Sequence, residues 1–378
     1  MPVCIGVLKE TSAHEARVAL TPDVTAKFVE LGATISLQRG AGERSHFGDE
    51  AYKGAQLAAG AAEVLGSANV LLTVQPPTPA EIDALAPGTV VVGFMQAHQQ
   101  LDMVRRLRDK RITSFAVEFI PRISRAQSMD ALSSQAAVAG YKAALLGANA
   151  LDKFLPMLTT AAGTIRPALV LVIGAGVAGL QAIATSRRLG AIVEAYDVRA
   201  ATKEQIQSLG AKFVDTGVAA DGAGGYAREL TAEEKAKQQA VLDSHIAKAD
   251  VVITTAAIPG RAAPRIISKA AVAAMGAGAV IVDLAAESGG NCAESQPGRT
   301  AVVDGVTVMA PLNLPSELAF HASQMYARNV TALLELLAPK GTLNVDMNDE
   351  IVRGSCVTHE GRVLYPAAPA PAAAGASR

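Results

Sequence analysis

Short runs of apolar residues alternate with amphipathic segments along most of this chain, a pattern typical of parallel β-sheets covered by helices. The clearest run, residues 169–173, is rich in β-branched residues and lacks the alternation of a half-exposed strand. Helix formers at residues 180–189 and a second apolar run at 191–196 follow it. The pattern predicts a strand, a helix and a strand, with the first strand buried on both faces of a sheet.

The same pattern predicts further strands and helices on both sides of this unit. We expect strands at residues 3–7, 34–38, 70–74, 90–94, 212–214, 250–255 and 279–284. We expect helices at residues 22–31, 50–59, 129–154, 205–209, 229–248 and 316–337. Thr21 as N-cap and Pro22 at the first helical position mark the start of the first helix.

The alternation of strands and helices predicts an α/β fold of two Rossmann-like, doubly wound domains with mainly parallel sheets. The two long helices, 129–154 and 316–337, are expected to join them. We predict an N-terminal domain of residues 1–130 with 318–365, and a nucleotide-binding domain of residues 131–317. The Pro- and Ala-rich end, 366–378, is predicted to be a disordered tail.

A glycine-rich turn follows the strand at 169–173 and predicts dinucleotide binding. Residues 174–179 match G-x-G-x-x-G, in which the glycines allow a tight bend, close approach to a pyrophosphate and close packing of the helix. Asp197 ends the next strand, where an acidic side chain accepts hydrogen bonds from the ribose hydroxyls of NAD. The candidate NAD-binding residues here are Gly174, Gly176, Val177, Gly179, Asp197, Val198 and Arg199.

Residues 168–186 carry no charge, and a stretch of this length also suggests a membrane span. The three glycines, Gln181 within the stretch, and Arg187 with Arg188 directly after it favour the strand–turn–helix interpretation instead.

Composition narrows the function classes. Half of the 378 residues are hydrophobic and the formal net charge is −1, so the chain has no basic field for nucleic acid. The N-terminus lacks the layout of a signal peptide, which predicts a cytoplasmic location. The three cysteines are dispersed, as are the six histidines, so we expect neither a disulfide framework nor a metal site.

Several motifs resemble one family along nearly the whole chain. Lys9-Glu10 and residues 17–22 resemble the opening of the family that joins alanine dehydrogenase to the NAD(H)-binding alpha subunit (domain I, alpha-1 type) of bacterial proton-translocating NAD(P) transhydrogenase. Residues 121–130, PRISRAQSMD, resemble the transhydrogenase branch, and the resemblance continues through residues 161–164, 197–205, 224–227 and 289–292.

This resemblance implies roles for particular residues. Arg122, Gln127 and Asp130 take the catalytic positions of the transhydrogenase loop. Further residues implied to contact nucleotide are Ile123, Ser124, Arg125 and Ser133, with Gly225 and Tyr226 on a flap over the bound nucleotide. Thr255 and Ala257 follow a predicted strand, and ligands of doubly wound sheets bind at that edge, so we expect them near the nicotinamide half.

Alternatives exist for several of these residues. Asp130 is equally suited to cap the following helix. Glu287, a lone acid on a predicted loop, is more typical of a solvated side chain than of a catalytic one. Alanine dehydrogenase is known for a lysine and a histidine that bind substrate and move its proton, and the matching positions here are Gln75 and Gln96. Since an amide is no acid or base near neutral pH, these residues argue against amino-acid chemistry.

The resemblance also implies cofactor and partners. The chain would bind NAD(H), and NADP(H) would lie on a partner, the NADP(H)-binding domain of the beta subunit. Membrane-embedded subunits would hold it at the inner membrane, and the family suggests a homodimer. The alternatives are an NAD-dependent alanine dehydrogenase-like amino acid oxidoreductase, and an NAD-sensing module without chemistry.

Overall fold

The computed structural model describes residues 3–218, 231–257 and 262–365. The chain divides into two compact units, the first formed by Met1–Gln135 with Ser316–Arg378 and the second by Ala136–Pro315. The predicted tail, 366–378, lies outside the described residues.

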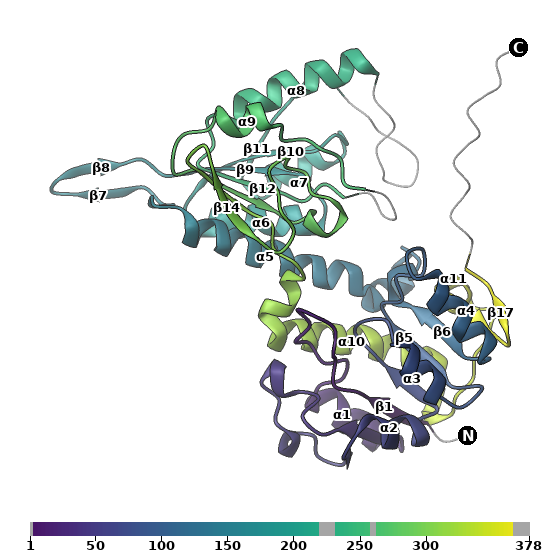
Figure 1. Ribbon diagram of the computed structural model, residues 1–378. Helices are drawn as coiled ribbons and strands as arrows, with labels where there is room; N and C mark the ends of the chain where they lie inside the picture. Colours follow the sequence, from purple (N-terminus) through teal and green to yellow (C-terminus); the bar gives the residue numbers. More distant parts are fainter. Residues whose placement is uncertain (1–2, 219–230, 258–261, 366–378) are drawn as a thin grey trace, which may run out of the picture. The chain divides into compact units, whose positions relative to one another are not determined.

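A seven-stranded sheet forms the centre of the described region of the second unit, in the order β11-β10-β9-β12-β13-β15-β14 (Figure 1). Its strands are β9 (Leu169–Ile173), β10 (Ile192–Tyr196), β11 (Lys212–Phe213), β12 (Val251–Thr254), β13 (Val280–Asp283), β14 (Thr300–Val303) and β15 (Val306–Met309). All neighbours run parallel except β14 and β15. The strand order reverses beside β9, and such a switch point is where doubly wound sheets bind ligands.

Helices cover both faces of this sheet. On one face, Val170 and Val172 of β9 pack with residues of α5 (Ala131–Ala150), α6 (Val177–Arg188) and α7 (Thr202–Ser208). On the other face, Leu171 and Ile173 pack with α8 (Ala232–Ile246) and α9 (Lys269–Ala273). The prediction that β9 is buried on both faces is confirmed.

A two-stranded hairpin, β7 (Leu158–Thr160) and β8 (Gly163–Ile165), projects from the second unit (Figure 1). The sequence pattern did not predict it. The hairpin strands contain no buried residue, so the apolar spacing that marks a core strand is absent.

The first unit contains an eight-stranded sheet in its described region, in the order β17-β16-β6-β5-β4-β1-β2-β3. Its strands are β1 (Cys4–Val7), β2 (Thr34–Gln38), β3 (Gln56–Ala58), β4 (Val70–Leu72), β5 (Val90–Gly93), β6 (Thr113–Ala116), β16 (Cys356–His359) and β17 (Arg362–Val363). Strands β1 to β6 run parallel, and β16 adds to β6 antiparallel.

The helices of the first unit also lie on both faces of their sheet. One core contains residues of α1 (Pro22–Glu30), α10 (Ala319–Leu337) and α11 (Glu350–Ser355). The other contains residues of α2 (Ala61–Ser67), α3 (Pro79–Ala84) and α4 (Leu101–Asp109). The predicted α/β class with mainly parallel sheets is therefore confirmed in both units.

The helix predicted at residues 50–59 is wrong. A short 3₁₀ turn, η2 (Asp49–Ala51), and strand β3 occupy this stretch instead. Gly54 between them has φ of 83°, which ends any helix, and β3 pairs with the edge of β2. Pairing with an existing strand satisfies backbone groups that the local sequence alone does not reveal.

Both long helices exist, α5 and α10, and the first turn of α5 bonds to α10. The side-chain amide of Gln135 donates to the Ala322 carbonyl oxygen at 3.1 Å. Their role as connectors between domains stays a prediction. In the described residues, no helix has the length and apolar character needed to cross a membrane.

Candidate active site

Each of the three motif glycines, between β9 and α6, meets a different steric demand. Gly174 has φ of 98°, which L side chains rarely adopt. A Cβ on Gly179 would lie 1.8 Å from the Gly174 carbonyl oxygen, so only glycine lets α6 pack against the turn. A Cβ on Gly176, the N-cap of α6, would meet nothing within 4 Å. The N-terminus of α6 therefore has the open approach that a pyrophosphate needs.

Asp197, at the end of β10, joins the glycine turn to the next loop. One carboxylate oxygen accepts from the Ala175 amide at 2.7 Å, and the other accepts from the Arg199 amide at 2.9 Å. The Arg199 guanidinium donates to both oxygens, at 2.9 and 2.8 Å. Burial acts to raise the pKa of Asp197, but the hydrogen bonds from Arg199 and Ala175 outweigh it and lower the pKa. Asp197 is therefore an anion fixed beside the turn.

Thr255 follows β12, the neighbour of β9, and contacts the same turn. Its hydroxyl donates to the Gly174 carbonyl oxygen at 3.1 Å. Ala257, two residues on, is exposed. The structure thus brings Thr255 to the glycine turn, as the carboxyl-edge argument predicts.

Asn291 organises this loop, and the sequence pattern did not identify it as a functional residue. It is fully buried, and its amide donates to the carbonyl oxygens of Ala256 and Pro264, both at 2.8 Å. Its oxygen accepts from the Ala256 amide at 3.1 Å. The only signal in the sequence is its place in the Gly289-Gly290-Asn291-Cys292 motif.

The other nucleotide candidates of this unit are less tied to the turn. Val177 is exposed at the first position of α6, and Val198 is half-buried against the core beneath α8. Gly225 and Tyr226, with the flap predicted around them, lie outside the described residues.

In the first unit, the loop candidates lie on and around a 3₁₀ helix, η4 (Ser124–Met129). Ala126 and Met129 are buried and anchor the loop, whereas Arg122, Ser124 and Gln127 are exposed. Ile123 packs half-buried against the core. The loop therefore presents polar side chains outward from a fixed apolar base.

Asp130 caps α5. Its two carboxylate oxygens accept from the amide and the hydroxyl of Ser133, at 2.8 and 2.6 Å. The two candidates thus contact each other, and the capping interpretation of Asp130 has a direct geometric basis.

Arg125 has a structural partner. Its guanidinium donates to Asp349 at 2.7 Å, and Asp349 caps α11 by accepting from the Ile351 amide at 2.8 Å. This ion pair accounts for the position of Arg125, and its contact with nucleotide stays a prediction.

A buried polar network lies beside the start of α5. Arg17, 4% exposed, donates from Nε and Nη2 to the carboxylate of Glu15, at 2.8 and 2.6 Å. Its Nη1 donates to Oε1 of Gln135 at 2.8 Å. The Glu15–Arg17 pair thus connects the turn after β1 to α5, although Gln135 lies 118 residues away.

Gln75 and Gln96 belong to this network. The Gln75 amide donates to Glu15 at 2.7 Å, and the Gln96 amide donates to the Gln75 oxygen at 3.3 Å. The two positions that the resemblance aligns with a substrate lysine and histidine therefore lie together, and their amides are engaged.

Carboxyls of this region differ in acidity. Burial raises the pKa of Glu10 to about 7, although its oxygens accept from the amides of Val74 and Gln75. For Glu15, burial is outweighed by the hydrogen bonds and charge of Arg17, which lower the pKa to about 2. Glu15 is thus a permanent anion at neutral pH, whereas Glu10 titrates near it.

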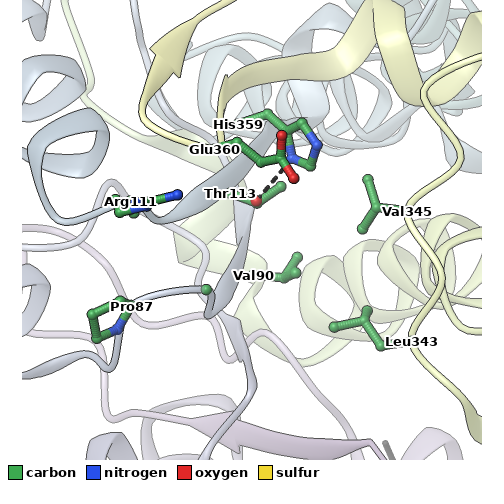
Figure 2. Close-up of a pocket in the computed structure, with 9 residues that line it drawn as sticks. Pro87, Val90, Arg111, Thr113, Leu343, Val345, His359 and Glu360 are labelled. Atoms are coloured by element: carbon green, nitrogen blue, oxygen red, sulfur yellow. Dashed lines mark hydrogen bonds between the residues drawn. The ribbon is translucent and has the colours of Figure 1, made fainter.

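A cavity of about 410 Å³ lies in the first unit, at the opposite edge of the sheet (Figure 2). Pro87 and Gly88 precede β5 and Arg111 precedes β6, so the cavity is at the amino ends of these strands. The loop of η4 and Gln96 follow the carboxyl ends of β6 and β5. The cavity is therefore separate from the candidate residues.

Two further sequence predictions have simple outcomes. Glu287 is exposed, and its carboxylate accepts from the Asn313 amide at 2.7 Å. Across residues 3–218, 231–257 and 262–365, no group of three or more His, Cys, Asp or Glu residues could hold a metal ion.

Comparison with known proteins decides the family. Residues 6–139 match the model of the alanine dehydrogenase/PNT N-terminal domain, and residues 143–366 match that of the alanine dehydrogenase/PNT C-terminal domain. The chain belongs to this alanine dehydrogenase/PNT family. The resemblance found in the sequence is thereby confirmed.

Individual members place the chain within the alanine dehydrogenase/PNT family. An NAD(P) transhydrogenase subunit alpha chain of Rhodospirillum rubrum is 44% identical, over 96% of this chain and 98% of the relative. The crystal structure of transhydrogenase from Sinorhizobium meliloti superposes with a TM-score of 0.85 at 40% identity, covering 96% of this chain and 99% of that one. Alanine dehydrogenase of Halomonas elongata is 29% identical, over 96% and 95%. The chain is thus nearer to the transhydrogenase alpha subunits.

Proposed function

We propose that this chain is the NAD(H)-binding subunit of a proton-translocating NAD(P) transhydrogenase and exchanges hydride directly with NADP(H) on a partner subunit. The observation that carries the proposal is the Asp197 carboxylate bonded to the Ala175 amide within the glycine turn. The 44% identity to a transhydrogenase alpha subunit across nearly the whole chain supports the same function.

Residues of the second unit suit NAD rather than NADP. The α6 N-terminus receives the pyrophosphate, and Asp197 accepts from the adenosine ribose hydroxyls. A 2′-phosphate would meet the charge of Asp197. Arg199, a residue type that pairs with a 2′-phosphate, instead forms two hydrogen bonds with Asp197.

Residues of the first unit position the reacting end. When bound, NAD(H) supplies the carbon that gives or takes hydride. Arg122, Gln127, Asp130 and Ser133 would hold and polarise the nicotinamide, with Asp130 also fixing Ser133. Transfer between two nicotinamide rings requires no protonation of the reacting atoms, so positioning by polar groups is sufficient.

The dehydrogenase alternative is weaker because of the network around Arg17. Conversion of an amino acid to an imine requires proton transfer as well as hydride transfer. The amides of Gln75 and Gln96 cannot supply it, and Glu15 already neutralises Arg17 with two hydrogen bonds. A substrate carboxylate would have to displace a buried ion pair, which is costly.

The proposed partners are membrane-embedded transhydrogenase subunits and the NADP(H)-binding domain of a beta subunit. The chain would then lie on the cytoplasmic side, peripherally associated with the inner membrane. The name of the Rhodospirillum rubrum relative, a subunit alpha, supports an assembly of several subunits.

We further propose a homodimer in which the β7–β8 hairpin packs on a second copy. All residues of both strands are exposed, and exposed apolar side chains gather here, with Met157 64% and Ile165 48% exposed. A two-stranded hairpin alone is marginal in water, and clustered exposed apolar residues mark interaction surfaces.

The deciding experiment mixes the purified chain with a separately expressed NADP(H)-binding transhydrogenase domain. Hydride transfer from NADPH to an NAD analogue is followed by absorbance. We expect transfer that requires both proteins.

Other outcomes select the alternatives. Turnover of NAD with L-alanine by the isolated chain would select the dehydrogenase. NADH binding without transfer, with NADP(H) bound to the partner, would select the sensing module.

A further inference from the structure

The loop of η4 and the first turn of α5 are both bonded to Asn329, on α10. Its Nδ2 donates to the Ser128 carbonyl oxygen at 2.8 Å, and its Oδ1 accepts from the Ser134 hydroxyl at 2.6 Å. Ser128 follows Gln127, and Ser134 follows Ser133. The single amide therefore connects the two sides of Asp130.

Only a carboxamide can make both bonds in this orientation. A backbone carbonyl only accepts, so Nδ2 must face Ser128 and Oδ1 remains for Ser134. An aspartate at this position would keep the bond to Ser134 but place an anion against the Ser128 carbonyl, and a leucine would lose both bonds.

The helix that carries Asn329 is itself fixed. Tyr326, three residues earlier, is fully buried, and its hydroxyl donates to the Thr73 carbonyl oxygen at 2.6 Å. Val330, next to Asn329, is 1% exposed in the core. Residues three apart lie on neighbouring positions of a helix surface, so the amide is held on a rigid support.

We propose that Asn329 is a positioning residue for hydride transfer. It holds η4 and the start of α5 in one arrangement, so that Gln127, Asp130 and Ser133 are presented together. Asn329 acts through this loop and does not itself contact nucleotide. The inference rests on the proposed transhydrogenase function for its kinetic consequence, and on the two hydrogen bonds for its structural one.

The test compares Asn329→Leu and Asn329→Asp with Asn69→Leu. Asn69 is the matched control because it also lies in the first unit and accepts from a backbone amide, that of Cys4, at 2.8 Å. Three quantities are measured for the full chain: amide hydrogen exchange of residues 124–134, NADH affinity, and single-turnover hydride transfer with the NADP(H)-binding domain.

For Asn329→Leu we expect faster exchange in residues 124–134, transfer slowed about 10- to 100-fold, and NADH affinity within about twofold of wild type. Asn329→Asp should lie between. Asn69→Leu should leave both the loop's exchange and the transfer rate unchanged. Combined with Gln127→Asn, Asn329→Leu should add less than its separate effect, because both act on one unit.

Unchanged exchange and transfer in Asn329→Leu would overturn the proposal, as would an equal loss in Asn69→Leu. If Asn329→Leu loosens the loop while the wild-type mixture transfers no hydride, the bridge exists and the transhydrogenase function is wrong.

Discussion

The carboxylate of Asp197 accepts a hydrogen bond from the backbone amide of Ala175, with 2.7 Å between oxygen and nitrogen. This bond joins the end of β10 to the turn after β9, so one anion shapes the turn and stands ready for a ribose. We expect Asp197→Asn to weaken NADH binding by about 10- to 100-fold, since hydrogen bonds to charged groups contribute about 1.5–3 kcal/mol. A titration of NADH fluorescence measures it.

Glu194→Gln is the matched control for Asp197→Asn. Glu194 lies on the same strand, but its carboxylate bonds to His245 and Lys212 rather than to the turn. NADH affinity should stay within about twofold of wild type. Equal weakening in both variants would contradict the role of Asp197.

Gln127 is exposed beside a well-anchored loop, so shortening its side chain should change chemistry rather than stability. We expect Gln127→Asn to slow single-turnover hydride transfer about 10- to 100-fold while NADH affinity stays nearly intact. Gln56→Asn, at an exposed position on edge strand β3, should change neither. A large loss of NADH affinity would show that Gln127 binds rather than positions.

Gly140 lets α5 pack closely against the start of α6. A Cβ there would lie 2.0 Å from the Ala178 carbonyl oxygen. We expect Gly140→Ala to lower the free energy of unfolding by about 1–3 kcal/mol, measured by denaturant titration of the second unit's transition. Gly66→Ala, in α2 with nothing within 4 Å, should be neutral or stabilise by up to about 1 kcal/mol. Similar losses in both would contradict the packing argument.

Glu10 makes stability depend on pH. Because its pKa rises from 4.5 to about 7, the folded chain holds a proton that the unfolded chain releases between these values. Its contribution therefore weakens folding as pH rises from 4.5 through 7. Glu10→Gln should gain stability relative to wild type between about pH 5 and pH 8, approaching about 3 kcal/mol in urea titrations.

Glu15 gives the opposite sign. Its pKa is lowered to about 2, so its contribution is present above pH 4.5 and lost as pH falls through 2. Glu15→Gln should be least stable relative to wild type near neutral pH. A Glu10→Gln difference that is independent of pH would contradict the assignment.

The β7–β8 hairpin provides a test of the proposed homodimer. A charge at Met157 or Ile165 would be buried without a partner if a second copy covers the hairpin. We expect Met157→Asp with Ile165→Asp to give a monomer by light scattering. Val302→Asp, at a 70% exposed apolar position on β14, should leave the assembly unchanged. A mutant hairpin that still dimerises would contradict the interface.

Missed elements show the limits of local patterns. The hairpin has no buried face, and β16 is defined by pairing with β6, from which it is separated by about 240 residues. Residues 50–59 carry helix-like spacing, but pairing with β2 and the positive φ of Gly54 make a strand. In each case a distant partner decides the structure.

By itself, the sequence determined the α/β class, β9, the glycine turn and the acid at Asp197, because strand burial, tight turns and helix packing impose residue types at short spacing. It also identified the η4 loop through its resemblance to a family. Only the tertiary structure decided which side chains support these groups. Arg17 reaches Gln135 across 118 residues, and Asn329 reaches Ser128 across 201. A hydrogen bond between distant segments leaves no periodic signal in either segment, because its geometry exists only after the sheet and helices have packed.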